Sequence, residues 1–287
     1  MFCGTARRAA FRAAVALLLL IVLPTAAHAT CQAVARAPAP ATGSFAPVSL
    51  SADATLSLLR ARGLRAAVDD SVALTFLGHS SFLLRSTAGV AAITDYNGYI
   101  RAATPPDIVT MNHAHGTHYT DVIEPGVTHV LRGWDTGSGI PRHEIEVRDL
   151  KVRNVPTNIR DGFAGTEFAG NSIFIFETAG LCVAHLGHLH HQLEPGHIAQ
   201  IGLVDVLLAA IDDGWTMAQT GMVQVIETLQ PSVVIPMHYD GPWRLSSFAA
   251  LMRERGWTVS EAAGSSIELT RATLPRKTVL ALQPSQF

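Results

Sequence analysis

Short apolar runs, separated by glycine, serine and histidine, dominate the chain from residue 72 to residue 236. Such runs, bounded by turn-forming residues, are typical of β-strands. The pattern predicts strands at 72–77, 81–84, 90–94, 107–111, 129–131, 144–152, 172–177, 181–185, 205–210 and 232–236. Thr178-Ala179-Gly180 joins two of these strands and has the length of a hairpin turn.

Apolar residues recur at helical spacing in three other segments. These predict helices at 51–65, at about 216–229 and at 243–255, the last followed by Gly256 as a natural stop. Short strands followed by strands mixed with helices favour an α/β layered fold, and no internal repeat divides the chain. We therefore expect one large domain.

The first 29 residues have the pattern of a secretory signal peptide. Three arginines precede an apolar run, and Ala27 and Ala29 are the small residues that a signal peptidase recognises. The run is too short to be a comfortable permanent membrane anchor. We predict cleavage after Ala29 and a periplasmic or secreted protein with no stable membrane anchor. Residues 30–46, rich in alanine and proline, predict a tether, and 47–287 the folded domain.

Charge and cysteine content narrow the range of partners. Without the predicted leader the chain has 18 basic and 23 acidic residues, a net charge of −5, and only two lysines. No basic stripe exists, so we expect a small-molecule substrate and not a nucleic acid. Cys31 and Cys182 remain after cleavage. Cys182 lies in an apolar run, which favours a small buried hydrophobic role, with a disulfide between the two as the alternative.

Histidines gather directly after predicted strands. The chain has 13 of them, and the stretches MNHAHGTHYTD (111–121), VAHLGHLHH (183–191) and PMHYD (236–240) hold most of the candidates. In extended backbone His113 and His115 point to the same side, so both imidazoles can bind one metal ion. His185, from a distant part of the chain, can supply a third nitrogen. Three neutral imidazoles and a water make an open site that lowers the pKa of the water to about 7.

These stretches, together with FLGHSSFLL (76–84), ITDY (93–96) and DVLLAAIDDGWTM (205–217), resemble the metallo-β-lactamase superfamily. The chain is most similar to the branch that includes ascorbate-6-phosphate lactonase and related phosphodiesterases. The resemblance runs along most of the predicted domain. It implies an αββα sandwich with a metal cleft along one edge of its two sheets.

The resemblance also implies roles for individual residues. By position, His113, His115 and His185 fall on the ligands of a first metal. His118 and His238 fall on ligands of a second metal. Asp95 falls beside the site, where it would orient a ligand imidazole. The metal implied is zinc (Zn2+), with iron or manganese as alternatives.

Two positions depart from the family pattern. Thr117 stands where the pattern has an aspartate, and His188 stands where it has a bridging aspartate. Two dications about 3.5–4 Å apart repel by roughly 17–19 kcal/mol at an effective dielectric constant near 20. Loss of both carboxylates therefore predicts one tightly bound ion and leaves a second uncertain.

His188 has three open interpretations. It would complete a second three-histidine set with His118 and His238, or act as a general acid or base. In the third interpretation, the site has lost catalytic activity but still binds a metal or a ligand. Two further segments stay open at this point: His79 would either face the cleft or stabilise its loop, and Asp212-Asp213-Gly214 is predicted to be a turn outside the site.

The function that the sequence predicts is an exported metal-dependent hydrolase. A metal-activated water would attack an ester, lactone or phosphodiester, with His188 and Asp95 as the candidate catalytic residues. One alternative is a mononuclear iron enzyme of oxygen chemistry on the same fold. The other is a non-catalytic protein that binds a metal or a ligand.

Overall fold

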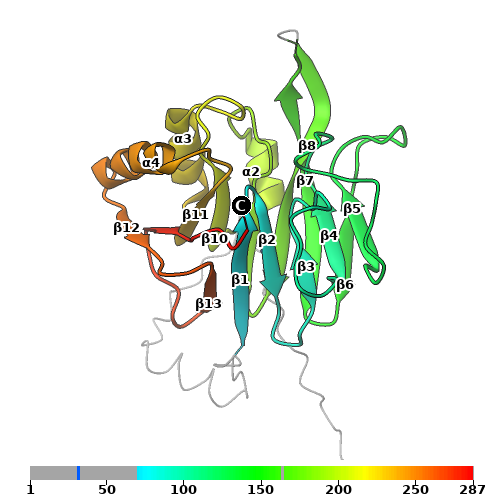
Figure 1. Cartoon of the computed structure of the whole chain (residues 1–287). Helices are drawn as coiled ribbons and strands as arrows, with labels where there is room; N and C mark the ends of the chain where they lie inside the picture. The colour runs from blue at the N-terminus through cyan, green and yellow to red at the C-terminus, as the bar shows by residue number, and fades with distance from the viewer. Residues whose placement is uncertain (1–30, 33–69, 163–164, 287) are drawn as a thin grey trace, which may run out of the picture.

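The computed structural model describes residues 31–32, 70–162 and 165–286. In this part of the chain two β-sheets pack face to face (Figure 1). The predicted leader, the helix at 51–65 and residues 33–46 of the predicted tether lie outside the described residues.

The first sheet has six strands in the order β13-β1-β2-β3-β4-β5. Their bounds are β1 Ser71–Gly78, β2 Ser81–Arg85, β3 Ala91–Ile93, β4 Ile108–Met111, β5 His129–Arg132 and β13 Ser266–Thr270. Strands β3, β4 and β5 run parallel, and β1 is antiparallel to β2, which is antiparallel to β3. The carboxyl ends of β1, β3 and β4 therefore lie at the same edge of this sheet.

The second sheet has eight strands in the order β12-β14-β11-β10-β9-β8-β7-β6. Their bounds are β6 Glu144–Val147, β7 Leu150–Arg160, β8 Thr166–Thr178, β9 Leu181–His185, β10 Val206–Ala210, β11 Val233–Met237, β12 Thr258–Glu261 and β14 Thr278–Ala281. Strands β9, β10 and β11 run parallel in its centre. Three helices are described: α2 Pro195–Ile201, α3 Gln219–Leu229 and α4 Pro242–Glu254.

Side chains of the central strands point alternately to the two faces of the sheet and fill two apolar layers. In β10, Val206 and Leu208 face the six-stranded sheet, whereas Leu207 and Ala209 pack in the layer that contains α3 and α4. Successive strand residues point to opposite faces, so a strand buried on both sides is apolar throughout. This explains why β10 reads as a continuous apolar run in the sequence.

The two sheets with helices on the outer face of the larger one match the predicted sandwich. Among the described residues, loops cover the outer face of the smaller sheet, where Tyr119 and Trp134 pack against Val109 and Met111. None of the described helices is long and apolar enough to cross a membrane.

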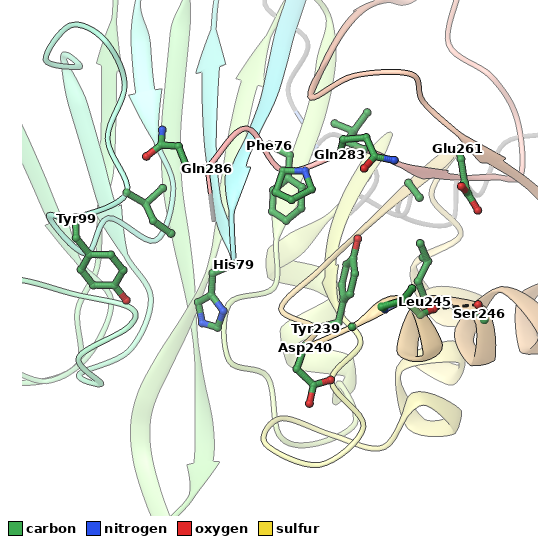
Figure 2. Close-up of a pocket in the computed structure, with 16 residues that line it drawn as sticks. Phe76, His79, Tyr99, Tyr239, Asp240, Leu245, Ser246, Glu261, Gln283 and Gln286 are labelled. Carbon is green, nitrogen blue, oxygen red and sulfur yellow. Dashed lines mark hydrogen bonds between the residues drawn. The ribbon is translucent and has the colours of Figure 1, made fainter.

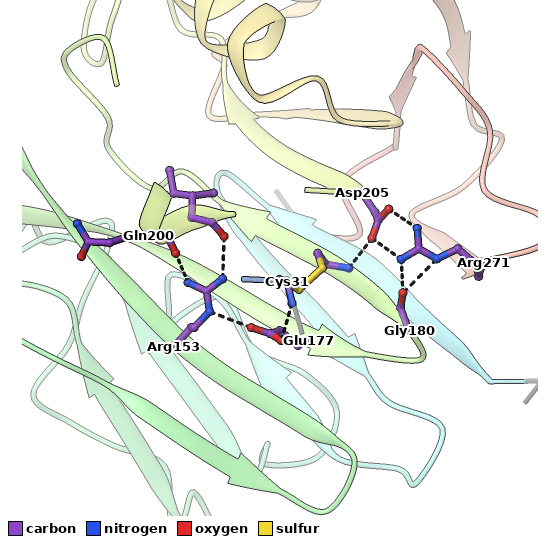
Figure 3. Close-up of a disulfide and its surroundings, with 9 residues drawn as sticks. Cys31, Arg153, Glu177, Gly180, Gln200, Asp205 and Arg271 are labelled. Carbon is purple, nitrogen blue, oxygen red and sulfur yellow. Dashed lines mark hydrogen bonds and ion pairs between the residues drawn. A yellow bond between two sulfur atoms is a disulfide. The ribbon is translucent and has the colours of Figure 1, made fainter. Parts of the chain in front are cut away.

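A disulfide joins Cys31 to Cys182 of β9 (Figure 3). The favoured prediction, that Cys182 is simply a buried hydrophobic residue, was therefore wrong. Cys31 also hydrogen-bonds through its backbone, donating to Glu177 Oε2 at 3.1 Å and accepting from the amide of Leu203 at 2.7 Å. Residue 31, at the start of the predicted tether, is fully buried and fixed to the domain.

Candidate metal centre

The site forms where the carboxyl ends of strands from both sheets meet. His79 follows β1, Asp95 follows β3, and His118 lies in the loop after β4. From the other sheet, Asp212 follows β10 and His238 follows β11. Because each apolar strand ends at this edge, the polar residue that comes next is delivered to one place.

Three of these residues adopt a backbone conformation that favours glycine. His79, Asp95 and His238 have φ values of 51°, 52° and 54°. A non-glycine residue in this region costs of the order of 1–3 kcal/mol and persists where the surroundings hold it. The amide of His238 donates to the carbonyl of His79 at 2.7 Å, which ties two of the three together. Strain of this kind concentrates at functional sites.

His118 and His238 present their Nε2 atoms to each other at a distance of 3.3 Å. A carboxylate stands behind each ring. Asp95 Oδ2 lies 2.5 Å from Nδ1 of His118, and Asp212 Oδ2 lies 2.9 Å from Nδ1 of His238. Because each Nδ1 proton is donated to a carboxylate, each Nε2 carries a lone pair directed into the gap between the rings.

Other groups hold the two carboxylates in their charged form. Burial alone would raise the pKa of Asp95, but the charge interaction and hydrogen bond with His118, together with the hydrogen bond from Ser80, hold the pKa well below its usual range. Burial would likewise raise the pKa of Asp212, and hydrogen bonds from His238 and Thr216 lower it instead. Two negative charges therefore stand directly behind the imidazoles at neutral pH.

His79 completes the group. One nitrogen from each of His79, His118 and His238 lies within 4.8 Å of the others. Nε2 of His79 is buried and has no hydrogen-bond partner among the described residues. Burial, followed by the neighbouring His238 and His118, lowers the pKa of His79 to about 4, so its ring is neutral at pH 7. The sequence left this residue undecided between the cleft and its own loop.

These nitrogens fit a metal ion. Two nitrogens each about 2.0–2.1 Å from a tetrahedral zinc lie roughly 3.3–3.4 Å apart, which matches the separation of the two Nε2 atoms. The carboxylate behind each ring is the usual support of a metal-binding imidazole. The orphaned Nε2 of His79 offers the third ligand.

Comparison with known proteins agrees with this geometry. The family model of the beta-lactamase superfamily domain matches residues 73–238. The chain belongs to the metallo-β-lactamase superfamily. The matched span begins just before His79 and ends at His238, so it contains the whole cluster.

Members of this superfamily with similar sequences come from archaea and bacteria. A UPF0173 metal-dependent hydrolase of Thermococcus kodakarensis is 26% identical over 190 residues, which cover 59% of this chain and 85% of the relative. One from Archaeoglobus fulgidus is 27% identical over 191 residues, covering 58% and 83%. A superfamily structure from Thermotoga maritima has a TM-score of 0.56 and 26% identity, and the match covers 74% of this chain and all of the other.

His185 has a different place from the one predicted for a metallo-β-lactamase ligand. Its Nε2 donates to the carbonyl of Ser80 at 2.8 Å, and its Nδ1 accepts from the amide of Gly187 at 3.1 Å. Both nitrogens are thus occupied, and the fully buried ring packs edge-on against Phe82. Alternation along β9 turns the ring between the sheets, where it holds the two together. In this structure His185 therefore presents no free nitrogen to a metal, and its role as a ligand stays a prediction from the resemblance.

His113 and His115 stand beside the cluster and not in it. Their rings stack with centroids 6.2 Å apart, and among the described residues they form no close nitrogen group with His185. His113 donates from Nδ1 to the carbonyl of Gly170 at 2.7 Å, and Nδ1 of the exposed His115 lies 3.1 Å from the Thr117 hydroxyl. The first metal predicted from the resemblance therefore lacks an assembled ligand set here.

His188 lies against the cluster. Its ring centroid is 4.8 Å from that of His118 and 5.2 Å from that of His238. Its Nδ1 is buried without a hydrogen-bond partner among the described residues. Burial, followed by the surrounding imidazoles, lowers the pKa of His188 to about 2. The ring is neutral, and its free nitrogen can accept a hydrogen bond or bind a cation.

Asp212 is the site residue that the sequence missed. It lies in a predicted turn, and its carboxylate does organise one by accepting from the amides of Gly214 and Thr216. Its second role, holding His238, needs a partner 26 residues away. Its place immediately after an apolar strand, as for Asp95, is the signal that could have identified it.

Proposed function

We propose that this protein is a metal-dependent hydrolase with a metal ion bound by His79, His118 and His238. The observation that carries the proposal is the pair of Nε2 atoms at 3.3 Å, each on a ring held by a buried carboxylate. Two Nε2 atoms at this distance need a proton or a metal ion between them, because two facing lone pairs would repel. The relatives that are named metal-dependent hydrolases point to the same chemistry.

Charge favours a single divalent ion. Three neutral imidazoles contribute no charge, and the carboxylates of Asp95 and Asp212 together contribute −2. Thr117 and His188 add none, so a second dication would have nothing to offset it. Imidazole ligands suit zinc and iron alike, and we propose zinc as the native ion.

When bound, a zinc ion would act as a Lewis acid and lower the pKa of a water molecule towards neutrality. The chain itself sets the geometry. Asp95 and Asp212 accept hydrogen bonds from the Nδ1–H groups of His118 and His238, which fixes the tautomer of these two rings. His188 offers Nδ1 as a hydrogen-bond acceptor next to His118. Tyr99 and Tyr239, on either side of His79, line the pocket and present hydroxyl groups to a substrate (Figure 2). We propose that water is added across an ester or lactone bond.

Metal analysis with matched variants tests the proposal. Protein purified without added metal should hold one ion per chain, predominantly zinc. A His118→Ala, His238→Ala variant should lose it, whereas His115→Ala, which removes an exposed histidine outside the group, should keep it. Chelation should abolish hydrolysis of p-nitrophenyl esters, and zinc or manganese should restore it. Hydrolysis that survives complete metal removal would contradict the proposal, as would predominant iron with oxygen uptake.

We also propose that the mature protein works in the periplasm or outside the cell. The leader pattern of residues 1–29 supports this. The disulfide between Cys31 and Cys182 adds independent support, because disulfides form and persist in oxidising compartments.

A further inference from the structure

A pocket of about 650 Å³ opens beside the metal centre, and His79 belongs to both. Figure 2 shows the His79 ring with Tyr99 on one side and Tyr239 on the other, and the rest of the pocket extending towards Glu261. The cavity has the size of typical small-molecule sites. If the scissile bond of a substrate lay next to His79, the rest of the substrate would therefore lie in this pocket.

Apolar side chains make up most of the wall. Phe76 of β1, Leu245 of α4 and Leu282 after β14 contribute apolar surface. Tyr99 and Tyr239 add aromatic rings. Because these residues come from both sheets and a helix, the wall is part of the folded core and not of one loop. Such a surface favours an apolar acyl or alkyl group.

The charged residues of the pocket are all acidic. Asp240 and Glu261 line it, and none of its 16 lining residues is lysine or arginine. The nearby Arg244 is already engaged: its Nη1 lies 2.9 Å from Asp213 and its guanidinium stacks on Trp243. It also lies 3.7 Å from Asp240, whereas Glu261 forms no ion pair within the described residues.

We propose, on the basis of the hydrolase function above, that the substrate is an acyl compound with an uncharged or cationic apolar body and no phosphate. Phosphate and carboxylate groups are recognised by arginine, lysine or backbone amides. Here an anionic body would lie along an apolar wall that carries two solvent-exposed carboxylates and no basic side chain. Glu261 is the residue that sets this preference, because its charge is uncompensated.

Three esters of equal length test the preference on zinc-loaded protein. They are the p-nitrophenyl esters of hexanoic acid, of glutaric acid with one free carboxylate, and of 4-(trimethylammonio)butanoic acid. We expect kcat/KM for the neutral and cationic esters to exceed that for the anionic ester at least tenfold. Glu261→Lys should reduce this ratio at least tenfold. Glu254→Lys, at the other end of α4 and about 18 Å along the helix from Pro242, should leave it unchanged.

The outcomes separate this inference from the proposed function. Preference for the anionic ester or for bis(p-nitrophenyl) phosphate would overturn the inference while the hydrolase proposal stands, and so would a ratio that Glu261→Lys leaves unchanged. If no ester is hydrolysed, the hydrolase proposal fails. Calorimetry on metal-free protein then decides the inference: pentyltrimethylammonium should bind at least tenfold more tightly than hexanoate, and equal binding would overturn it.

Discussion

Two of the three proposed ligand imidazoles, His118 and His238, each have their own carboxylate, and the two carboxylates are not equivalent in their surroundings. Asp95 is fully buried and receives bonds from Ser80 and His118, whereas Asp212 also holds a turn through Gly214 and Thr216. Removal of the charge at Asp212 leaves a neutral amide that supports the His238 ring less well. The residue therefore couples the conformation of a loop to the basicity of a metal ligand.

Asp212→Asn should weaken zinc binding by about 10–100-fold, because the supporting carboxylate fixes the tautomer and raises the basicity of His238. The neighbour Asp213→Asn is the matched control, since Asp213 binds Gln219 and Arg244 and not a histidine of the centre. Competition with a chromophoric chelator measures the affinity of both variants. Equal affinity in the two would contradict the assigned role of Asp212.

A buried neutral histidine makes stability depend on pH, and His188 is such a residue. Its pKa is lowered from 6.5 to about 2 in the folded state. Below pH 6.5 this histidine is therefore protonated in the unfolded chain but stays neutral in the folded chain. The free energy of unfolding of metal-free protein should therefore fall as the pH drops from 6.5, by up to about 1.4 kcal/mol per pH unit from this group. Urea denaturation of wild type and His188→Asn between pH 8 and 5 checks this. The variant should show a shallower slope, and parallel slopes would rule the effect out.

At the residue scale the sequence predicted part of the centre. The family resemblance placed His118 and His238 among the candidate ligands, and the structure brings their rings together. His79 remained undecided because the direction of its ring depends on a left-handed backbone conformation after β1. The hydrogen bonds of His185 to Ser80 and Gly187 could not be predicted, since a histidine after a strand gives no indication of whether its nitrogens are already bonded to protein.

At the scale of elements, strands placed by apolar runs were easier to predict than strands at the edges of the sheets. The segment 144–152 spans a hairpin: Arg148, at a φ of 53°, lies in the turn between β6 and β7, which pair antiparallel with Val147 opposite Leu150. The edge strands β12 and β13 have exposed, alternating residues with little apolar content, so no run marked them. The short helix α2 likewise presents only Ile201 as a fully buried residue.

The disulfide joins Cys31 to β9, the strand that carries His185. It closes a loop of 151 residues, and removal of a native disulfide typically costs about 2–5 kcal/mol. The Cys31→Ser, Cys182→Ser variant should lose stability in this range, because the unfolded chain gains the conformations that the loop forbids. Chemical denaturation of the variant, and of wild type with a reductant, gives the two values to compare. A variant as stable as the oxidised protein would contradict the prediction.

At the scale of the whole molecule, each sheet supplies part of the metal centre. The six-stranded sheet positions His79, Asp95 and His118, and the eight-stranded sheet positions Asp212 and His238. An ion bound by both sides favours the packed sandwich over any state in which the sheets separate. The fold class could be predicted because the apolar runs fix the layers. The mostly apolar pocket with Asp240 and Glu261 in its wall has no signature in the sequence, because its lining residues are scattered between positions 76 and 286 and meet only in the folded chain.

Zinc should therefore stabilise the fold. At a free concentration 100 times the dissociation constant, binding adds about 2.7 kcal/mol, which corresponds to roughly 5–10 °C in Tm for a protein of this size. Thermal unfolding of the chelated and the zinc-loaded protein measures the shift. His238→Ala should show no zinc-dependent shift, and His115→Ala should retain it. A wild-type Tm that is the same with and without zinc would contradict the proposed metal centre.

If the protein is exported, its signal peptide should be cleaved and its two remaining cysteines should be paired. When the full sequence is expressed in a Gram-negative host, the protein should be recovered from the periplasm or the medium with Thr30 as its first residue. Cys31 and Cys182 should then resist labelling by maleimide, because the oxidising compartment pairs them. Replacement of Ala29 by aspartate should block processing, since the peptidase requires a small residue there. Intact-mass measurement with and without maleimide reports both events, and an unprocessed cytoplasmic chain with reactive thiols would contradict the assignment.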